Sequence, residues 1–454
     1  MLQAAVAPPK IMESVSGPEL PPRRVADLPG ITSLEVRRLF PEIPEAIRFE
    51  DNDLSGIRQA AERSLAHVDM GMIRAGDSVN LLCSEHGFSI LGGGPYAEML
   101  RAIKDVVEER TGCRNMRLRF AVGSTRSEAR EMLPYFGLDD YFEGRVKGLG
   151  PFDRGVPIET DIGTLYGIKK VYDADWIIHA HYDDPRELYY HHQIDRTLKA
   201  FTMSYARLET RSLYHKNFDT RSSNIVPRAI FESPFVQGKF AFTVFLVTSP
   251  DGVIDIGADN DLHRLNRRLN KNTLKSFGKL IRLFSEIDEC VVALDAGRWP
   301  WYLHAGGLTS GNLFMAPTDH FDLDIYPPRK TGHKQVNPAV KMLLLNYTWR
   351  ENLHGLVARY PIVIAGQNLA EGLSFAARKH AKKIADNLEE AMAAAIEMAG
   401  TNKVIVFDGS FGSLNLSPSM GDFLISRAPE VSRKVDEHYL PLWLRQRGID
   451  PAEA

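Results

Sequence analysis

Residues 78–123 read "SVNLLCSEHGFSILGGGPYAEMLRAIKDVVEERTGCRNMRLRFAVG", and this stretch decides the fold class of the chain. It begins with a short apolar run, residues 78–84, which is typical of a buried strand. A glycine-rich loop follows, and residues 96–112 then show the spacing of a helix that ends at Gly112. Residues 116–123 form a second strand candidate. A strand, a helix and another strand in this order predict a parallel sheet with covered faces.

The alternation of helices and strands continues on both sides of this stretch. Further helices are predicted at residues 53–68, 125–137, 271–287 and 387–400, and further strands at residues 173–180, 289–297, 361–367 and 402–409, the last of these being the final strand. Residues 239–260 predict a β-hairpin that turns across Pro250 and Gly252. We therefore expect an α/β protein of two lobes with mostly parallel sheets and a ligand-binding cleft between the lobes.

Composition and charge exclude several classes of protein. The chain has 454 residues, 44% hydrophobic and 25% charged, which is ordinary for a globular protein of two or three domains. A formal charge of -3 gives no electrostatic case for binding nucleic acid or an anionic membrane. Three cysteines far apart argue against a disulfide framework and a thiolate zinc site, and favour a reducing cytoplasm. Neither a membrane-spanning run nor a signal peptide is expected.

Two turns between a strand and a helix are candidate anion sites. Gly92, Gly93 and Gly94 lie just before a predicted helix, whose N-terminal amides attract phosphate or carboxylate. They match neither GxGxxG nor a P-loop, and a flexible turn that needs positive φ angles is the more common explanation for such glycines. The second turn contains Thr125, which can cap the next helix, and Arg126, which can bind an anion through two hydrogen bonds.

Residues 187–215 concentrate side chains of the kind that hold metals and move protons. They include three of the chain's 14 histidines, three arginines and Lys199, with neither proline nor glycine, and we expect them to be helical in large part. Just before them, His179 and His181 alternate along a strand and so point to one face. Histidine pairs suit metal binding or proton transfer, but they are more often part of a polar surface or a hydrogen-bonded core. Lys199 lies among apolar residues, where it is either a desolvated nucleophile or a snorkelling lysine.

The order of these segments resembles that of the nickel-pincer-nucleotide lactate racemases. In that family a lysine precedes a nickel-binding histidine by sixteen residues, and Lys199 and His215 have this separation, with "SYARLETRSLYH" similar to the sequence between them. Residues 119–133, "RFAVGSTRSEAREML", are similar to the family's strand, Gly-x-His-Arg turn and helix. Residues 155–180 resemble the stretch that leads to the family's central site. The likeness extends along nearly the whole chain.

The resemblance implies a fold and a chemistry. It implies a lactate racemase-like catalytic domain at residues 51–265 and a second α/β domain at residues 266–454, and the prolines near the start of the sequence suggest an extended arm at residues 1–50. It also implies a nickel pincer nucleotide tethered to Lys199, with the nickel bound by His215. The family's reaction is racemisation or epimerisation of a 2-hydroxy acid, in which a hydride leaves C2 for the cofactor and returns to either face.

The sequence departs from the family at its acid and base residues. Thr125 stands where the family's turn has a proton-shuttling histidine, and a threonine hydroxyl is a poor base near neutral pH. The family's Asp-x-x-Arg motif reads "EHGF" at residues 85–88 and lacks the arginine. The replacement bases that we consider are His86, His191, His192 and His304. These departures predict a substrate other than that of the family, such as a larger sugar acid.

Two further hypotheses come from other classes of protein. A ligand-binding or regulatory protein that keeps the fold without the catalysis would explain the threonine at position 125. An unrelated enzyme with a free dinucleotide is the third, and the lack of a GxGxxG motif with an acidic partner counts against it. The sequence leaves the substrate, its stereochemistry and the oligomeric state open.

Overall fold

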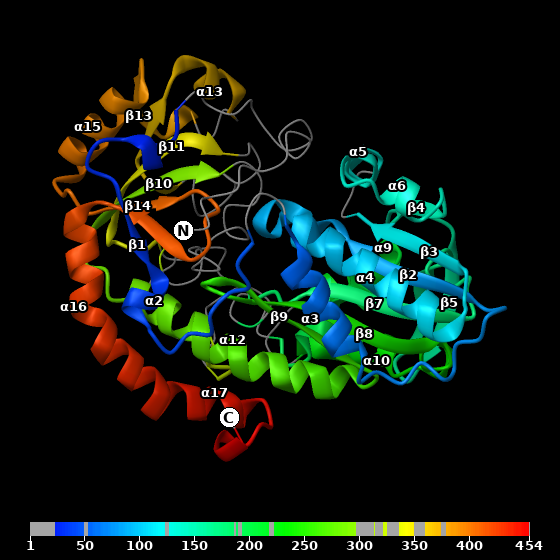
Figure 1. Ribbon diagram of the computed structural model, residues 1–454. Helices are drawn as coiled ribbons and strands as arrows, with labels where there is room; N and C mark the ends of the chain where they lie inside the picture. The colour runs from blue at the N-terminus through cyan, green and yellow to red at the C-terminus, as the bar shows by residue number, and fades with distance from the viewer. Residues whose placement is uncertain are drawn as a thin grey trace. The chain divides into compact units, whose positions relative to one another are not determined.

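A computed structural model describes the chain in two compact units (Figure 1). The described residues are 23–49, 53–122, 127–185, 188, 193–217, 222–296, 313, 321–324, 336–348, 359–373 and 378–453. The unit called central here comprises Ala46–Thr248 and Val253–Asn272, and the unit called terminal comprises Met1–Glu45, Ser249–Gly252 and Thr273–Ala454. Within the described part of the chain, none of the helices combines the length and the apolar character needed to cross a membrane.

The central unit is built on a six-stranded sheet in the order β4-β3-β2-β7-β8-β9. Its strands are β2 (Ser78–Ser84), β3 (Asn115–Ala121), β4 (Val146–Leu149), β7 (Trp176–Tyr182), β8 (Phe240–Ser249) and β9 (Gly252–Asp259). Strands β4, β3, β2, β7 and β8 pair in parallel, so their carboxyl ends lie at one edge of the sheet. A separate antiparallel ribbon consists of β5 (Gly155–Thr160) and β6 (Gly163–Ile168).

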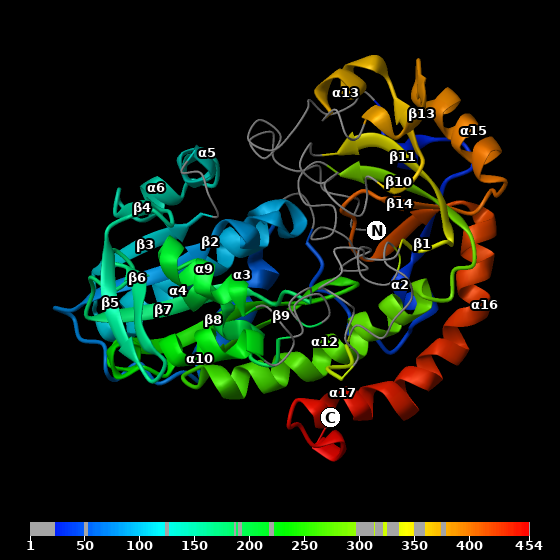
Figure 2. The same cartoon turned by 180° about the vertical axis from the view of Figure 1, so that it is seen from behind.

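Helices cover both faces of this sheet, as Figures 1 and 2 show from opposite sides. One face carries α4 (Gly94–Thr111), which packs beside α3 (Ser55–Leu65). The other face carries α8 (Lys199–Thr202), α9 (Leu208–Lys216) and α10 (Ile225–Phe231). Shorter elements are η2 (Glu85–Gly93), α5 (Ser127–Tyr135), α6 (Leu138–Tyr141), η3 (Arg196–Leu198), η4 (Ser222–Asn224) and α11 (Pro234–Gln237).

The second face holds the apolar core that positions the candidate site. Leu82, Ile177 and Phe245 project from β2, β7 and β8, and they pack against Phe201 of α8 and Ile230 of α10. The alternation of side chains along each strand sends every second residue to this face. Residues on the same face but nearer the carboxyl edge are therefore held over a rigid, fully covered sheet.

The terminal unit has a seven-stranded sheet in the order β1-β15-β14-β10-β11-β12-β13. Its strands are β1 (Thr32–Glu35), β10 (Cys290–Ala296), β11 (Val340–Thr348), β12 (Ile362–Ala365), β13 (Ala381–Ala385), β14 (Val404–Phe407) and β15 (Ser413–Leu416). The five strands from β14 to β13 pair in parallel, whereas β15 pairs antiparallel with both β14 and β1. The chain's first described strand thus lies beside its last.

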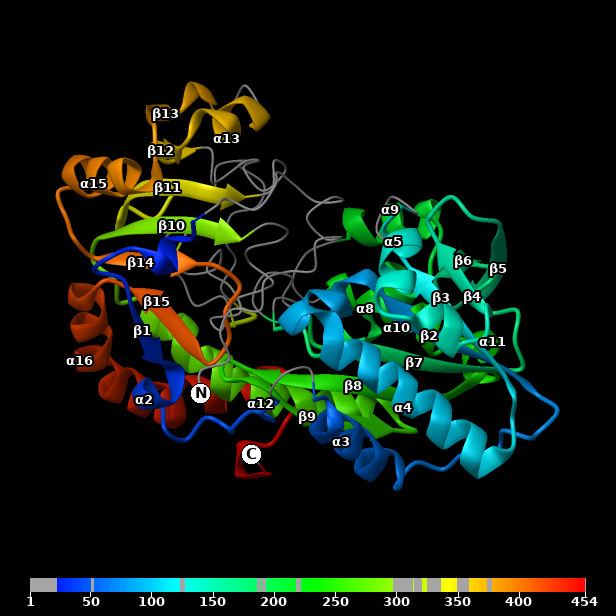
Figure 3. The same ribbon diagram turned by 45° about the horizontal axis from the view of Figure 1, so that its top comes forward.

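One face of the terminal sheet is covered by α15 (Leu388–Ala399), which Figure 3 shows alongside β11. The other elements are η1 (Val25–Asp27), α2 (Val36–Leu39), α13 (Gln367–Gly372), α16 (Pro418–Lys434), the π-helix η8 (Val435–Tyr439), α17 (Leu440–Gln446) and η9 (Pro451–Glu453). The long helix α12 (Leu262–Phe284) contributes residues 262–272 to the central unit and 273–284 to the terminal unit.

The predicted α/β class with mostly parallel sheets is confirmed, and two local predictions need correction. Residues 402–409 do not hold the final strand, because β15 follows and pairs back onto both β14 and β1. The segment 187–215 is less helical than expected: in its described part, α8 ends at Thr202 and α9 begins at Leu208. Tyr205 and Ala206 make the break, since they pair with the ribbon strand β6 instead of continuing a helix.

Candidate functional site

The carboxyl edge of the central sheet brings together polar residues from β2 and β7. Ser84 ends β2, and His179 and His181 lie near the end of β7. The two imidazole rings share one face, as predicted, with 5.6 Å between their centroids. Ligands of open parallel sheets commonly bind beyond the carboxyl ends of the strands, so this edge is the natural place to look for a site.

His179 is a core residue. It is fully buried, and its Nδ1 lies 2.8 Å from the hydroxyl of Tyr205 while its ring packs against Phe201. Burial lowers the pKa of His179 well below its usual range, and the nearby His181 lowers it further. The backbone of Thr197 favours the charged form, but within the described residues Nε2 makes no hydrogen bond of acceptable geometry. His179 is therefore neutral near pH 7.

His181 lies in a more polar setting two residues further along β7. Its Nδ1 is 3.0 Å from the carbonyl oxygen of Tyr182, and its Nε2 is 3.3 Å from the hydroxyl of Ser84. A carbonyl oxygen only accepts, so in the neutral ring Nδ1 carries the proton and Nε2 accepts from Ser84. His181 was seen in the sequence as one of a pair, but its tautomer follows only from these contacts.

Lys199 and His215 lie on two short helices that contact each other, α8 and α9. Lys199 is half-buried at the start of α8, directly after η3. His215 is exposed in the last turn of α9, and its Nδ1 is 2.8 Å from the carbonyl oxygen of Arg211. The bond to a carbonyl oxygen places the ring proton on Nδ1, so Nε2 is the ring nitrogen with a lone pair that could bind a metal.

Arg211 ties the two helices together from a buried position. Its Nε donates to the carbonyl oxygen of Ala206 over 2.9 Å, and Ala206 belongs to the connection between α8 and α9. Burial lowers the pKa of Arg211 to about 10, an effect that the negative charge of Glu85 opposes. Glu85, itself buried, is the first residue after β2, so charges from the sheet edge and from α9 face each other.

His86 and the triple glycine belong to the connection between β2 and α4. His86 is half-buried, with its Nδ1 3.8 Å from a carboxylate oxygen of Glu85. Gly92 and Gly93 have φ angles of 70° and 83°, and a Cβ atom on Gly93 would come within 2.6 Å of the Phe136 ring. The turn therefore needs these glycines for its shape, and anion binding at the start of α4 stays a prediction.

The remaining predicted residues cannot be placed. Thr125, Arg126, His191, His192 and His304 lie outside the described residues. Among the residues that are described, no three His, Cys, Asp or Glu side chains gather in a way that would hold a metal ion. The role of His215 as a nickel ligand stays a prediction.

A buried ion pair that was not expected from the sequence lies next to Lys199. Arg196, in η3, pairs with Asp183 just after β7, and both side chains are almost fully buried. The Nε of Arg196 also donates to Asn270 of α12 over 2.6 Å. The pair therefore joins the end of β7 to the turn that leads into α8, and its partners lie too far apart in sequence to be paired by inspection.

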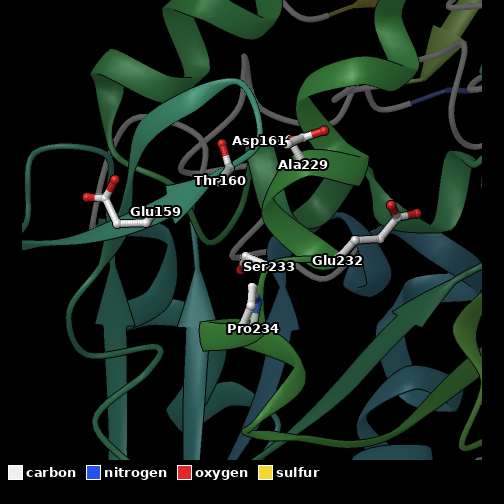
Figure 4. Close-up of a pocket in the computed structure, with 7 residues that line it drawn as sticks. All are labelled: Glu159, Thr160, Asp161, Ala229, Glu232, Ser233 and Pro234. Atoms are coloured by element: carbon white, nitrogen blue, oxygen red, sulfur yellow. The ribbon is translucent and has the colours of Figure 1, made fainter.

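A pocket of about 400 Å³ opens elsewhere on the central unit, between the turn of the β5–β6 ribbon and the ends of α10 and α11 (Figure 4). It is lined by Glu159, Thr160, Asp161, Ala229, Glu232, Ser233 and Pro234. The carboxylates of Glu159 and Glu232 point to opposite sides of it. None of the residues predicted from the sequence lines this pocket, so it does not belong to the Lys199 site.

His263, near the start of α12, lies between two carboxylates close to this pocket. Its Nδ1 is 3.7 Å from Asp195 and its Nε2 is 3.3 Å from Glu232. The interaction with Asp195 raises the pKa of His263, and burial opposes this effect only in part. Inspection of the sequence does not single out this histidine, because its partners come from two distant segments.

Comparison with models of known protein families and with curated proteins finds no match for this chain. A function for this chain therefore has to be inferred from its residues and from the resemblance to the lactate racemases.

Proposed function

We propose that this protein is a racemase or epimerase of a 2-hydroxy acid, and that its cofactor is a nickel pincer nucleotide. Lys199 would carry the cofactor covalently and His215 would bind its nickel. The same proposal places the protein in the cytoplasm, because its three cysteines are free and buried, as is usual for proteins of reducing compartments.

The placement of Lys199 and His215 is the observation that supports this proposal most. They stand on contacting helices, and Arg211 joins the second helix to the connection between them. The half-buried position of Lys199 limits the motion of anything attached to it. The Nδ1 bond of His215 orients its Nε2 in the way that metal-binding histidines are usually oriented. The donor set therefore fits the proposed group.

The chain's own residues would supply orientation and proton transfer. When bound, the cofactor supplies hydride chemistry at the carbon that carries the hydroxyl group. A base is still needed for the hydroxyl proton, and Thr125 does not provide one. His86, at the carboxyl edge beside Glu85, is the candidate base that the structure describes, and His191, His192 and His304 remain candidates from the sequence.

The test is intact-protein mass spectrometry with metal analysis, on protein co-produced with the enzymes that mature the cofactor. We expect an adduct on Lys199 and about one nickel per chain, and we expect the Lys199→Arg variant to carry neither. Lys216→Arg, on the exposed end of α9, is the matched control and should load normally.

A chain that stays bare while a known family member loads in parallel would overturn the proposal. That result would favour the second candidate, a ligand-binding or regulatory protein on this fold. The threonine at position 125, where the family has a proton-shuttling histidine, supports this candidate. Thermal-shift screening with hydroxy acids and sugar acids would then be the next measurement.

A further inference from the structure

One face of helix α12 carries three polar residues that hold the segment in front of Lys199. His263, Asn266 and Asn270 have the spacing of a single helix face. Asn266 and Asn270 both donate from Nδ2 to the carbonyl oxygen of Ile194, over 2.8 Å and 3.0 Å. His263 faces the carboxylate of Asp195. We call these three residues the α12 clamp.

The segment that the clamp holds, residues 194–197, is fixed from other sides as well. The backbone amides of Ile194 and Asp195 both donate to the side-chain oxygen of Asn224, over 2.9 Å and 3.0 Å. Arg196 adds its buried pair with Asp183. Since Lys199 follows only two residues after the segment, these contacts set the backbone from which its side chain extends.

His263 is the member of the clamp whose charge changes with pH. Three carboxylates favour its protonated form: Asp195 from the held segment, Glu232 from the end of α10, and Asp261 just before α12. Arg228 of α10 also pairs with Asp195 and opposes a second positive charge there. Burial of the ring opposes protonation too, but the carboxylates prevail and raise its pKa.

We propose that His263 is a positioning residue whose protonation tightens the hold of α12 and α10 on residues 194–197. In the protonated state the ring bridges Asp195 and Glu232, which joins the held segment to the ends of two helices. In the neutral state the bridge loses its charge, and the segment is held by the asparagines, by Arg196 and by the pair of Arg228 with Asp195. The consequence for Lys199 as a cofactor-bearing residue rests on the proposed function. The pH-dependent hold on residues 194–197 does not.

The sign of the effect follows from linkage. A histidine whose pKa is raised by folding contributes its stabilisation below its ordinary pKa, and loses it as the pH rises through the raised value. The ring is partly exposed, so the bridge is screened by solvent, and we expect about a fivefold change in the opening equilibrium of the segment.

Hydrogen exchange of the full chain, followed by mass spectrometry at about pH 6 and about pH 8, tests the proposal. After correction for intrinsic exchange rates, peptides that cover residues 193–202 should be about fivefold better protected at the lower pH. His263→Gln should abolish this difference. His67→Gln, at an exposed histidine of the same unit, should keep it.

Glu232→Gln gives a second measurement if the His263 variant is unstable. Its side chain is 55% exposed, so the variant should fold, and the pH difference should shrink without vanishing. An unchanged pH difference in either variant would overturn the proposal. A pH-dependent hold together with a chain that never loads cofactor would leave the clamp standing and refute the proposed function alone.

Discussion

Three histidines of the central unit have different roles because their surroundings differ. Burial among aromatic rings lowers the pKa of His179, whereas flanking carboxylates raise the pKa of His263. His215 is exposed, and a backbone carbonyl fixes its tautomer. The sequence shows three histidines, and only their contacts distinguish a core residue, a pH-sensitive bridge and a metal-ligand candidate.

The role of His215 leads to the first prediction. His215→Ala should leave the adduct on Lys199 in place but lower the nickel content severalfold, because one ligand nitrogen is lost. Stability should change by less than about 0.5 kcal/mol, since the side chain is exposed. Mass spectrometry and metal analysis of the same sample measure both quantities. Full nickel occupancy in the variant would show that His215 is not a ligand.

Asp295 of β10 leads to a prediction about pH. Burial raises its pKa to about 6, even though Arg24 and the amide of Val25 stabilise its charge. The pKa of Asp295 is higher in the folded than in the unfolded protein. Its contribution to the free energy of unfolding is therefore greatest below about pH 4 and falls as the pH rises through 6. The cost of ionisation is on the order of 3 kcal/mol.

Asp295→Asn should therefore not destabilise the protein at about pH 7.5, and should weaken the fall in stability between about pH 4 and pH 6. Urea unfolding across that range measures both effects. Asp27→Asn, at an exposed position in the segment that contains Arg24 and Val25, is the control and should leave the difference in stability between about pH 4 and pH 6 in place. Strong destabilisation by Asp295→Asn at about pH 7.5 would mean that the contact with Arg24 outweighs burial.

At the scale of elements, a single turn decides how β2 is joined to α4. Gly93 is the N-cap of α4 with a left-handed backbone, and a side chain there would collide with Phe136 and with the carbonyl oxygen of Phe88. Gly94, the next residue, has a φ angle of -54° and only a looser neighbour in Leu54. The fold therefore requires glycine at position 93 but not at position 94.

Gly93→Ala should lower the free energy of unfolding by about 2–4 kcal/mol, because strain and collision add. Gly94→Ala should change it by less than about 1 kcal/mol, since alanine suits a first helical turn. Chemical denaturation of the two variants side by side gives the comparison. Equal effects would show that the turn is more adaptable than its backbone angles indicate.

The elements that were predicted well are those whose signals are local. Helix α15 begins after Asn387, whose side chain accepts from the amide of Glu390, and ends at Gly400 in a left-handed conformation. Both signals are visible in the sequence, as is the hairpin turn between β8 and β9. Strand β11 was missed although its apolar run is clear, and β1 and β15 were missed because each is short and needs the other.

In the candidate site, too, only features with a local sequence signal could be predicted. The shared face of His179 and His181 is a local feature, and the structure shows it as expected. The spacing of Lys199 and His215 is local as well, and the roles of these two residues stay predictions. The buried pair of Asp183 and Arg196, and the α12 clamp, join segments that are far apart in sequence. Contacts between distant segments depend on the fold and cannot be predicted from the sequence of any single segment.

At the scale of the whole molecule, the cysteines report on the two units separately. Cys83 and Cys113 belong to the central unit and Cys290 to the terminal unit, and all three are buried and free. Burial raises the pKa of each thiol, to about 12 for Cys290. The thiolate is the reactive form, so the folded protein should be nearly inert to thiol reagents.

We expect negligible labelling by Ellman's reagent in buffer and three labelled thiols per chain in concentrated guanidinium chloride. At intermediate denaturant, peptide mapping of the labelled sites should show Cys83 and Cys113 responding together. Rapid labelling of Cys83 in buffer would contradict its full burial near the end of β2, an inner strand of the central sheet.

The pairing of β1 with β15 also bears on how the chain is made on the ribosome. The central unit is complete once residue 272 has emerged, so it can fold while synthesis continues. Residues 32–35 leave the ribosome long before residues 413–416, with which they pair. During that interval the nascent chain carries an unpaired strand, and premature termination before β15 would release a folded central unit with an incomplete companion sheet.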